Sequence, residues 1–242
     1  MKDLKIEIYI PSYKRPKDTL TNKWITNSIL AVHESEAEEY QKHNSQKLLV
    51  LPDRLKGNMA SVRNFILDNS KADLTVMIDD DVKSVGYHEN MERNEISEGD
   101  LYYKLLEWSN QAKQLNTVLF GINLQSDPRF YMEYIPINLL SPVLGTFCCI
   151  LKTDIRYDER LGLNEDYDFS LKVLQKHHKI LRWNKYYYIA DHLEKEGGCG
   201  AYRTFTKEKE QAKLMMNKWG SAVRYNFEKS TNPRINCPLK GI

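Results

Sequence analysis

Three consecutive aspartates, Asp79, Asp80 and Asp81, directly follow a run of branched apolar residues in the stretch TVMIDDDVKSVG (75–86). The apolar run is typical of a buried strand, and three like charges at its end raise one another's pKa. A divalent cation would offset this repulsion, and carboxylate oxygens suit Mg²⁺ or Mn²⁺, which also bind substrate phosphates. Aspartate is also common in solvated turns. The triplet therefore indicates either a metal site or a solvated turn.

The residues that lead to the triplet alternate between strand and helix patterns. We expect a strand that stops at Pro11, helical spacing, a short strand, an amphipathic helix and a third strand, at residues 4–13, 18–43, 46–53, 57–70 and 72–81. This alternation predicts an α/β fold, with a parallel sheet and helices on its faces.

The second half is less regular. Helices are expected at 99–114, 164–177 and 206–220, and strands at 117–124, 129–140, 145–155 and 179–192. Asn164 is a plausible N-cap of the helix at 164–177, with acids in its first turn. The adjacent strands at 129–140 and 145–155 indicate a mixed or antiparallel continuation of the sheet, because no helix of adequate length separates them.

Length and composition restrict the class of protein. A chain of 242 residues, 41% hydrophobic and 28% charged, can bury one good core, which favours a single folded domain. The net charge of +2 means that any contact with a polyanion would come from local patches. The N-terminus lacks the apolar segment of a signal peptide, and no stretch approaches the ~18 apolar residues of a membrane span, so we expect a cytoplasmic protein.

The four cysteines, Cys148, Cys149, Cys199 and Cys237, form no CxxC pair. This pattern favours reduced thiols in the core over a disulfide framework or a zinc site.

Several motifs resemble the GT-A glycosyltransferases in their order and spacing. IPSYKRP (10–16), GNMASVRNFILD (57–68) and the aspartate triplet resemble the nucleotide-sugar half, and NEDYDFSL (164–171) resembles the acidic motif that opens the acceptor-side helix of family 2 enzymes. The resemblance implies a Rossmann-like mixed central sheet with helices on both faces. It also implies one domain over 1–242, with a nucleotide-sugar half at 1–85 and an acceptor half with a C-terminal extension at 86–242.

A wider set of segments resembles the TET-associated glycosyltransferases of bacteriophage and related gene clusters. The segments are GNMASVRNFILDN, YDERLGLNEDYDFSLKVL, LRWNKYYY, GGCGAYRT, KWG and PLKGI. The resemblance implies transfer of a sugar from a nucleotide-sugar, expected to be a UDP-sugar, to the hydroxyl of a 5-hydroxymethylpyrimidine such as 5-hydroxymethylcytosine in DNA. A phage-encoded enzyme of this kind would act in the host cytoplasm.

The same likeness assigns roles to the acids. Asp79 and Asp81 are the outer carboxylates of a DXD motif and would, with His192, hold Mn²⁺ or Mg²⁺ against the diphosphate; Asp79 and Asp80 are expected at the donor. Alternation along an extended chain would place Asp79 and Asp81 on one side and Asp80 on the other. An ordinary core or surface histidine is the alternative for His192.

The general base is expected in the NEDYD segment. In family 2 enzymes the second acid of the Glu-Asp pair takes the acceptor proton, which implies Asp166, with Glu165 and Asp168 as alternates. A single displacement would invert the anomeric configuration. The structural alternative is that these acids cap the helix or interact with its dipole.

Donor contacts are expected from two early loops and one late loop. Tyr13 could stack on the base and Arg15 could reach phosphate, while the RN pair of the family helix lies under the nucleotide. The glycine-rich segment EGGCGAYR (196–203) could close over the pyrophosphate. The candidate donor-binding residues of these loops are Pro11, Tyr13, Arg15, Gly57, Arg63, Asn64 and Arg203; solvated turns are the alternative.

The acceptor is the least constrained part of the interpretation. The segment KHHKILRWNKYYY (176–188) interleaves basic and aromatic residues, which suits a nucleic acid backbone and flipped bases, but it equally suits a strand whose tyrosines fill the core. Lys207, Lys209, Lys213 and Lys218 add positive charge to the late helix, diluted by Glu208 and Glu210. Two alternative functions stay open: a glycosyltransferase with a protein, lipid or polysaccharide acceptor, and a non-catalytic nucleotide-sugar or DNA-binding module.

Overall fold

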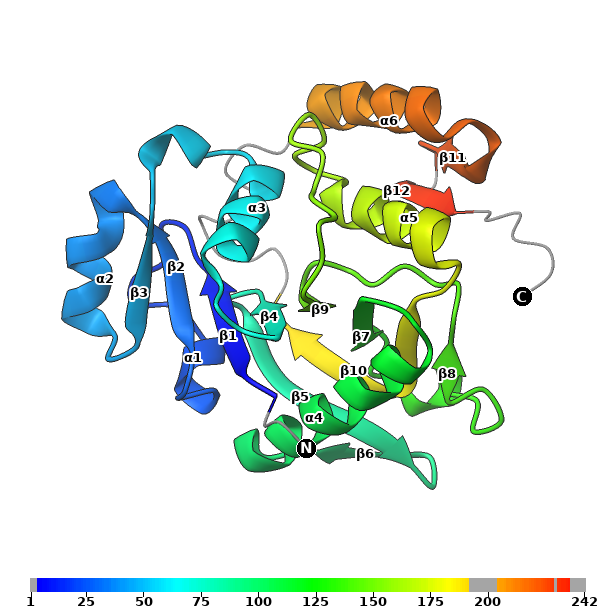
Figure 1. Cartoon of the computed structure of the whole chain (residues 1–242), viewed down its shortest axis with the longest axis horizontal. Helices are drawn as coiled ribbons and strands as arrows, with labels where there is room; N and C mark the ends of the chain where they lie inside the picture. The colour runs from blue at the N-terminus through cyan, green and yellow to red at the C-terminus, as the bar shows by residue number, and fades with distance from the viewer. Residues whose placement is uncertain (1–3, 192–203, 229, 236–242) are drawn as a thin grey trace.

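A ten-stranded mixed sheet forms the centre of the molecule in a computed structural model that describes residues 4–191, 204–228 and 230–235 (Figure 1). The strand order is β3-β2-β1-β4-β9-β7-β10-β5-β6, and β8 pairs with β10. The strands of this sheet are β1 (Ile6–Pro11), β2 (Ile29–His33), β3 (Lys47–Leu51), β4 (Leu74–Ile78), β5 (Val82–Glu89), β6 (Glu92–Glu95), β7 (Leu119–Asn123), β8 (Ile137–Asn138), β9 (Phe147–Leu151) and β10 (Leu181–Ala190).

The four strands at one end of the sheet are parallel. β1 lies between β2 and β4, and β3 pairs with β2. β9 then runs antiparallel to both β4 and β7. The carboxyl ends of β1 and β4 therefore meet at one edge of the sheet, which brings the loop after Pro11 to the aspartate triplet. The expected mixed α/β sheet is confirmed.

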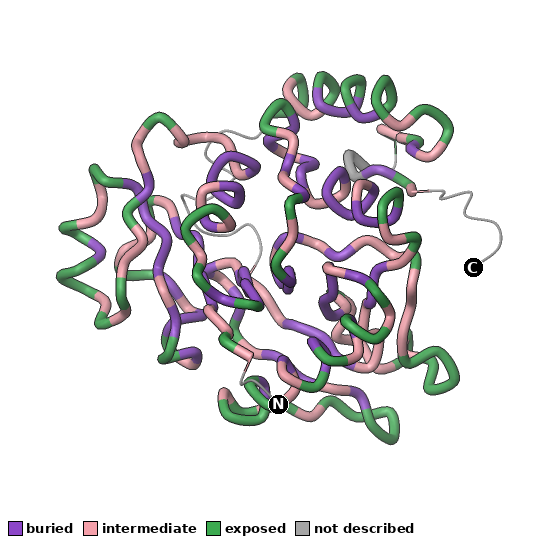
Figure 2. Tube along the Cα trace, in the orientation of Figure 1, coloured by how far each residue is buried: buried purple, intermediate pink, exposed green. Residues whose placement is uncertain are grey.

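Helices cover both faces of the sheet, as expected. The helices are α1 (Thr21–Trp24), α2 (Ala37–His43), α3 (Met59–Asn69), α4 (Glu98–Gln114), α5 (Glu165–His177) and α6 (Phe205–Trp219). Val76 and Ile78 of β4 belong to the core cluster that contains Trp108 of α4, whereas Met77 packs in the cluster that contains residues of α3 and α5. Alternate side chains of β4 thus face different helices, and Figure 2 shows this strand region buried while the outer turns of α2 and α6 are exposed.

The predicted helical segment at 18–43 is wrong over much of its length. It contains the short α1, the buried strand β2, a 3₁₀ turn at Glu34–Glu36 and α2. The apolar stretch Ile29–Val32 pairs with β1 on one side and β3 on the other, and this pairing outweighs the weak helical spacing around it. The polar residues that suggested a helix lie mostly in α2.

The predicted strand at 129–140 is also mostly absent. Only β8 forms there, after a 3₁₀ turn at Pro128–Phe130. Pro128 and Pro136 interrupt the segment, and Phe130, Met132 and Tyr134 are exposed, so the segment lacks both the donors and the burial that a strand requires.

The C-terminal part packs beside α5. α6 leads through a 3₁₀ turn to a separate two-stranded sheet of β11 (Val223–Asn226) and β12 (Ser230–Ile235), and Figure 1 shows this unit on the α5 side of the molecule. Cys148 and Cys149 are buried free thiols, as expected; Cys199 and Cys237 lie outside the described residues. Among the helices that the structure describes, none combines the length and apolar character of a transmembrane span.

Candidate active site

The side chain of Arg63 joins the aspartate triplet to the first turn of α5. It projects from α3 and is 3% exposed. Its Nη2 lies 3.3 Å from Oδ1 of Asp79, and its Nε lies 3.3 Å from Oε1 of Glu165. The guanidinium stays charged, because burial is outweighed by the surrounding negative groups, which raise its pKa. The predicted metal-side and base-side acids are therefore parts of one site.

Gly145, in the loop before β9, makes room for this arrangement. A Cβ at this position would lie 2.4 Å from Nη2 of Arg63, so a larger residue would displace the guanidinium. The backbone N–H of Gly145 also donates to Oδ2 of Asp166 at 3.0 Å. The same glycine thus contacts both the arginine and the predicted base.

Glu165, which is buried, and Asp166, which is half-buried, form an acid pair at the start of α5. Burial and the neighbouring Asp166 raise the pKa of Glu165 to about 8, although Arg63 acts in the opposite direction. Burial also raises the pKa of Asp166, against the N–H groups of Gly145 and Tyr167 that bond its two oxygens. A carboxylate with a raised pKa is a better proton acceptor near neutral pH. Asn164 occupies the N-cap position, but its side chain makes no capping hydrogen bond.

Asp80 faces the loop after β1. Its carboxylate accepts hydrogen bonds from the Ser12 hydroxyl and from Nη1 of Arg15, the latter at 2.9 Å. The Tyr40 hydroxyl supports the loop from the other side, since it hydrogen-bonds Ser12 at 2.6 Å and accepts from the Arg15 backbone N–H at 3.0 Å. Burial raises the pKa of Asp80. Asp80 therefore orders the loop that carries Tyr13 and Arg15, and its direct contact with the donor stays a prediction.

Asp81 has the chemistry of a metal ligand. Burial and the neighbouring Asp79 and Asp80 raise its pKa to about 7, and its Oδ2 lies 3.9 Å from Nη1 of Arg15. A divalent cation would offset these unfavourable contributions, so the hard oxygen donors of Asp79 and Asp81 fit Mg²⁺ or Mn²⁺. The described residues contain no cluster of three potential metal ligands, and His192 lies outside them.

The alternation expected along the triplet does not apply. β4 ends at Ile78, and the triplet forms the turn into β5 rather than extended strand. Asp80 and Asp81 consequently share Arg15, whereas Asp79 pairs with Arg63. A turn replaces the extended chain because the next strand, β5, leaves β4 to pair with β10 at the other end of the sheet.

Of the other predicted donor residues, three lie in or beside the two early loops, one has a structural role, and one lies outside the described residues. Tyr13 is half-buried and packs edge-on against His33, and Gly57 adopts a φ of +75° in the turn before α3. Pro11 is the buried last residue of β1. Asn64 instead exchanges two hydrogen bonds with the backbone of Tyr157, which gives it a structural role in fixing the chain before α5. Arg203 lies outside the described residues.

Asp168, the other alternate base, holds the C-terminal segment. Its fully buried carboxylate accepts a hydrogen bond from Nε1 of Trp219 at 2.8 Å, and it lies 2.7 Å from Nζ of Lys218 and 3.2 Å from Nζ of Lys172. Lys218 also pairs with Asp158 at 2.7 Å. These contacts favour a structural role for Asp168, and they pair the positive charge of Lys218 within the fold.

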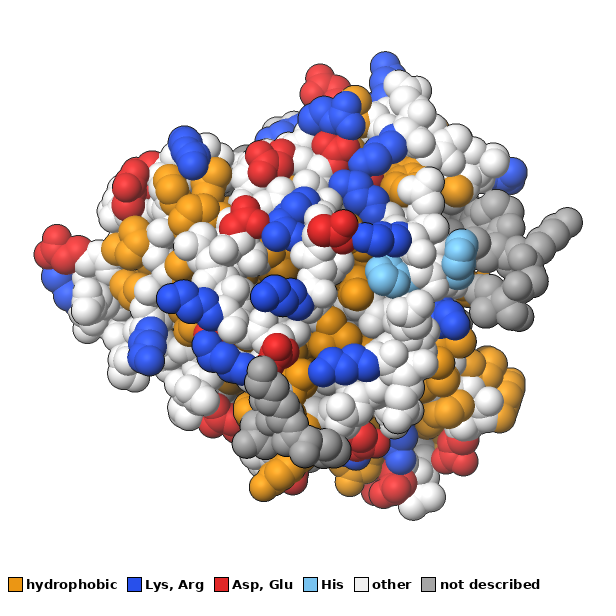
Figure 3. Space-filling model, viewed as in Figure 1, with side chains coloured by type: hydrophobic (Ala, Val, Ile, Leu, Met, Phe, Trp, Pro, Cys, Tyr) orange, Lys and Arg blue, Asp and Glu red, His pale blue; other side chains and the backbone are white. Residues whose placement is uncertain are grey.

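The aromatic residues of the segment 176–188 fill the core. Tyr186, Tyr187 and Tyr188 are buried, and Trp183 stacks on Trp108 at 5.8 Å. The core interpretation of these tyrosines is therefore the correct one. On the face drawn in Figure 3, Lys and Arg side chains are spread over the surface with acidic side chains among them.

Sequence reasoning missed Ser12, Tyr40 and Gly145, and it did not find the link that Arg63 makes. Ser12 lies inside the IPSYKRP motif, but Tyr40 and Gly145 carry no local signal, because their partners lie 21 residues or further away along the chain.

Comparison with solved structures identifies the fold. Glucosyl-3-phosphoglycerate synthase from Mycobacterium tuberculosis, in complex with Mn²⁺, UDP and phosphoglyceric acid, matches with a TM-score of 0.53 at 10% identity over 96% of this chain and 86% of that chain. Its complex with Mg²⁺ and UDP matches with a TM-score of 0.51 at 10% identity, over 91% and 82%. S. aureus TarS 1–349 matches with a TM-score of 0.46 at 14% identity, over 88% of this chain and 66% of that chain. In the longer TarS structure, this chain covers 40% of the TarS chain. The fold is that of the GT-A glycosyltransferases.

A search of curated proteins finds no match. A family model described as TET-Associated Glycosyltransferase matches residues 6–199, which include the triplet, Arg63, Gly145 and the acid pair. The chain therefore belongs to the TET-associated glycosyltransferase family.

Proposed function

We propose that this protein transfers a sugar from a nucleotide-sugar, preferentially a UDP-sugar, to the hydroxyl of 5-hydroxymethylcytosine in DNA, with inversion at the anomeric carbon. Family membership supports glycosyl transfer and suggests the DNA acceptor. The UDP complexes of the M. tuberculosis synthase support a UDP donor for this fold. The single observation that carries the proposal is the Arg63 bridge, because it unites the triplet and the acid pair in one site.

The donor side of the mechanism belongs to the triplet and the loop after β1. A divalent cation held by Asp79 and Asp81, with His192 as the proposed third ligand, would neutralise the departing diphosphate. Asp80 holds the loop after β1 through the side chains of Ser12 and Arg15, and Arg63 holds the Asp79 carboxylate. These residues therefore hold the charged groups of the donor side in place before the donor binds.

The acceptor side belongs to the first turn of α5. The acceptor oxygen forms a bond to the anomeric carbon as the bond from that carbon to the diphosphate breaks, and the acceptor proton passes to Asp166. The N–H groups of Gly145 and Tyr167 orient the Asp166 carboxylate for this step. A base within duplex DNA would have to leave the stack to reach this position.

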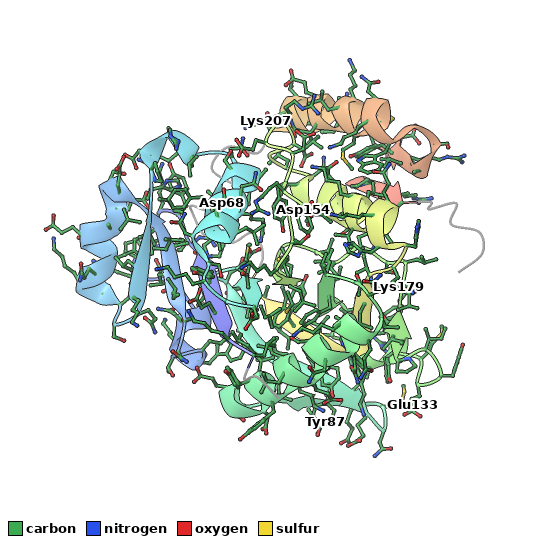
Figure 4. All side chains as sticks on the ribbon, in the orientation of Figure 1. Asp68, Tyr87, Glu133, Asp154, Lys179 and Lys207 are labelled. Atoms are coloured by element: carbon green, nitrogen blue, oxygen red, sulfur yellow. The ribbon has the colours of Figure 1, made fainter. Side chains whose placement is uncertain are left out.

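Mass spectrometry of nucleosides tests the proposal. The protein is incubated with Mn²⁺, a panel of nucleotide-sugars and DNA that contains 5-hydroxymethylcytosine, and the DNA is digested to nucleosides. We expect the mass of the modified nucleoside to increase by one sugar unit. The Asp81→Asn variant should lose this increase. The control Asp154→Asn, at a surface position labelled in Figure 4, should keep it. Transfer to protein or polysaccharide but not to DNA would contradict the acceptor. DNA binding without turnover of any donor would indicate a binding module instead.

A further inference from the structure

Arg182, near the start of β10, is partly exposed and has no acidic partner among the residues that the structure describes. Its Nε donates a hydrogen bond to Oδ1 of Asn184 at 3.1 Å, and its outer nitrogens, Nη1 and Nη2, make no hydrogen bond within the same part of the chain. The arginines of the site differ, since Arg15 pairs with Asp80 and Arg63 with two acids. An arginine side chain stays charged in proteins, so Arg182 presents two unused donor groups to solvent.

The strand register places Arg182 in one row with the residues beneath Arg63. Met77 of β4 pairs with Cys148 of β9, and Nη1 of Arg63 lies 3.8 Å from the sulfur atom of each. Cys148 in turn pairs with Gly121 of β7, and Gly121 pairs with Arg182. Two strand spacings, roughly 10 Å, therefore separate the backbones of Cys148 and Arg182. Arg182 lies beyond the Arg63 bridge as seen from β4 and the triplet.

The side chain of Arg182 belongs to the sheet face that α5 covers. Paired residues on neighbouring strands share a face, and a Cβ at Gly121 would lie 2.5 Å from Cγ1 of Val143. Val143 is bound to α5, because its N–H donates to the Ser170 hydroxyl at 3.2 Å and its carbonyl accepts from that hydroxyl at 3.3 Å. Ser170 lies about one helical turn after Asp166. Arg182 and the proposed base are therefore on the same face of the sheet.

Exposed apolar side chains flank β8, the strand that pairs with the start of β10. Tyr134 is 80% exposed, and Ile135 and Leu140 are also exposed. Asn184, which accepts the bond from Arg182, donates through Nδ2 to the carbonyl of Ile135 at 3.1 Å. Figure 3 shows hydrophobic side chains gathered at this end of the molecule, at the lower right. An unpaired cation near an exposed aromatic ring is a combination that suits a nucleic acid strand.

We propose that Arg182 binds a backbone phosphate of the acceptor DNA, beside the nucleotide whose hydroxyl Asp166 deprotonates. This inference rests on the proposed function and names the group that would hold the acceptor strand. A guanidinium binds phosphate through two parallel N–H···O bonds, and Nη1 and Nη2 are the donors that the fold leaves available. The donor diphosphate belongs to the triplet on the other side of the Arg63 bridge, so the phosphate at Arg182 comes from the acceptor.

The variant Arg182→Met tests the inference, because it removes the charge and keeps much of the side-chain length. Fluorescence anisotropy measures the binding of DNA that contains 5-hydroxymethylcytosine at several NaCl concentrations. We expect the affinity at low salt to fall about tenfold or more, the effect of losing a charged hydrogen bond. The slope of log affinity against log salt concentration should become shallower by about 1, the effect of one lost phosphate contact.

Two further measurements and two further variants distinguish this role from a structural one. In Arg182→Met, KM for the donor and the melting temperature should both stay at the wild-type values, because no carboxylate loses its partner. Arg182→Lys keeps the charge without the two-pronged geometry, so it should recover the salt slope and only part of the affinity. The matched control is Arg160→Met, an exposed arginine that Asp158 already pairs at 2.7 Å, and it should bind DNA as the wild type does.

The outcomes separate this inference from the proposed function. If the wild-type enzyme glycosylates DNA and Arg182→Met keeps the wild-type affinity and salt slope, the role of Arg182 is wrong. A raised KM for the donor would also overturn it, because the bound phosphate would then be that of the donor. A lower melting temperature in both Arg182 variants, with no recovery of the slope in Arg182→Lys, would indicate a structural arginine. Transfer by the wild type to protein or polysaccharide but not to DNA would overturn the proposed function, and this inference with it.

Discussion

Burial of the Arg63 guanidinium is energetically unfavourable by itself, and its contacts with Asp79 and Glu165 offset that cost. Taking charges out of water costs several kcal/mol per ion, so buried pairs of this kind contribute little net stability. Their effect is to fix geometry: Asp79, in the turn after β4, and Glu165, at the start of α5, each lie 3.3 Å from the planar guanidinium. The family resemblance implies a donor contact for Arg63, whereas its burial favours a positioning role.

Arg63→Met should both destabilise and inactivate the protein. Removal of the cation leaves the side chains of Asp79 and Glu165 without their partner, and breaking a buried pair in this way costs about 3–5 kcal/mol. Urea unfolding measures the change, and donor turnover should fall in parallel. Arg54→Met, at an exposed position, serves as the control. Wild-type stability of Arg63→Met would show that the bridge does not exist in solution.

Gly145→Ala is a smaller change that tests the same bridge. The new Cβ would lie 2.4 Å from Nη2 of Arg63, so the guanidinium must move away from its carboxylates. We expect kcat to fall at least tenfold and the free energy of unfolding to drop by about 1–3 kcal/mol, the usual range for overpacking. In the control Gly162→Ala, the nearest atom lies 3.5 Å from the new Cβ. Equal kinetics in the two variants would argue against the steric role of Gly145.

At the scale of elements, sequence patterns found the helices with a clear apolar stripe and missed short buried strands. α3 and α4 were predicted because their apolar residues recur at steps of three and four. β2 was missed because five residues of strand lie among polar helix-like neighbours, and only its pairing with β1 and β3 makes it a strand. β5 and β6 carry charged and polar residues, and their pairing at the far end of the sheet has no local signal.

The attachment of α6 gives a prediction at this scale. Asp168→Asn removes the charge that holds Lys218 and Lys172 and weakens the bond from Trp219, so α6 and the following hairpin should loosen from α5. Hydrogen exchange should show protection lost in α6, by about 3 kcal/mol or more, with little change in β1 and β4. The control is Glu210→Gln, an exposed acid on the same helix. If exchange in α6 were unaltered, the anchoring role of Asp168 would be wrong.

For the whole molecule, the predictable part of the site is the part that lies in continuous motifs. The triplet and the acid pair each occupy adjacent positions, so the residue types of the triplet indicate a metal site, and the resemblance to family 2 enzymes implies proton transfer at the acid pair. The contacts of Ser12 with Asp80 and of Arg63 with Gly145 and Glu165 depend on the strand order, which brings together segments up to about a hundred residues apart. The sequence does not contain that order in any local pattern, and so the bridge could not be foreseen.

Stability of the whole chain should depend on pH through the acid pair. The pKa of Glu165 is raised from 4.5 to about 8 in the folded protein, so between these values the folded state binds more protons than the unfolded state. The free energy of unfolding must then fall as pH rises from about 5 to 8, with a slope of at most about 1.4 kcal/mol per pH unit from this group. Asp166 acts in the same direction, because its pKa is also raised.

The variant Glu165→Gln removes one titrating group. Urea unfolding between pH 5 and 8 should therefore give a shallower dependence of the free energy of unfolding on pH than in the wild type. The control Glu133→Gln, at an exposed position labelled in Figure 4, should keep the wild-type slope. A slope that is the same in all three proteins would mean that Glu165 ionises as readily in the folded chain as in the unfolded one, and that burial and Asp166 do not raise its pKa.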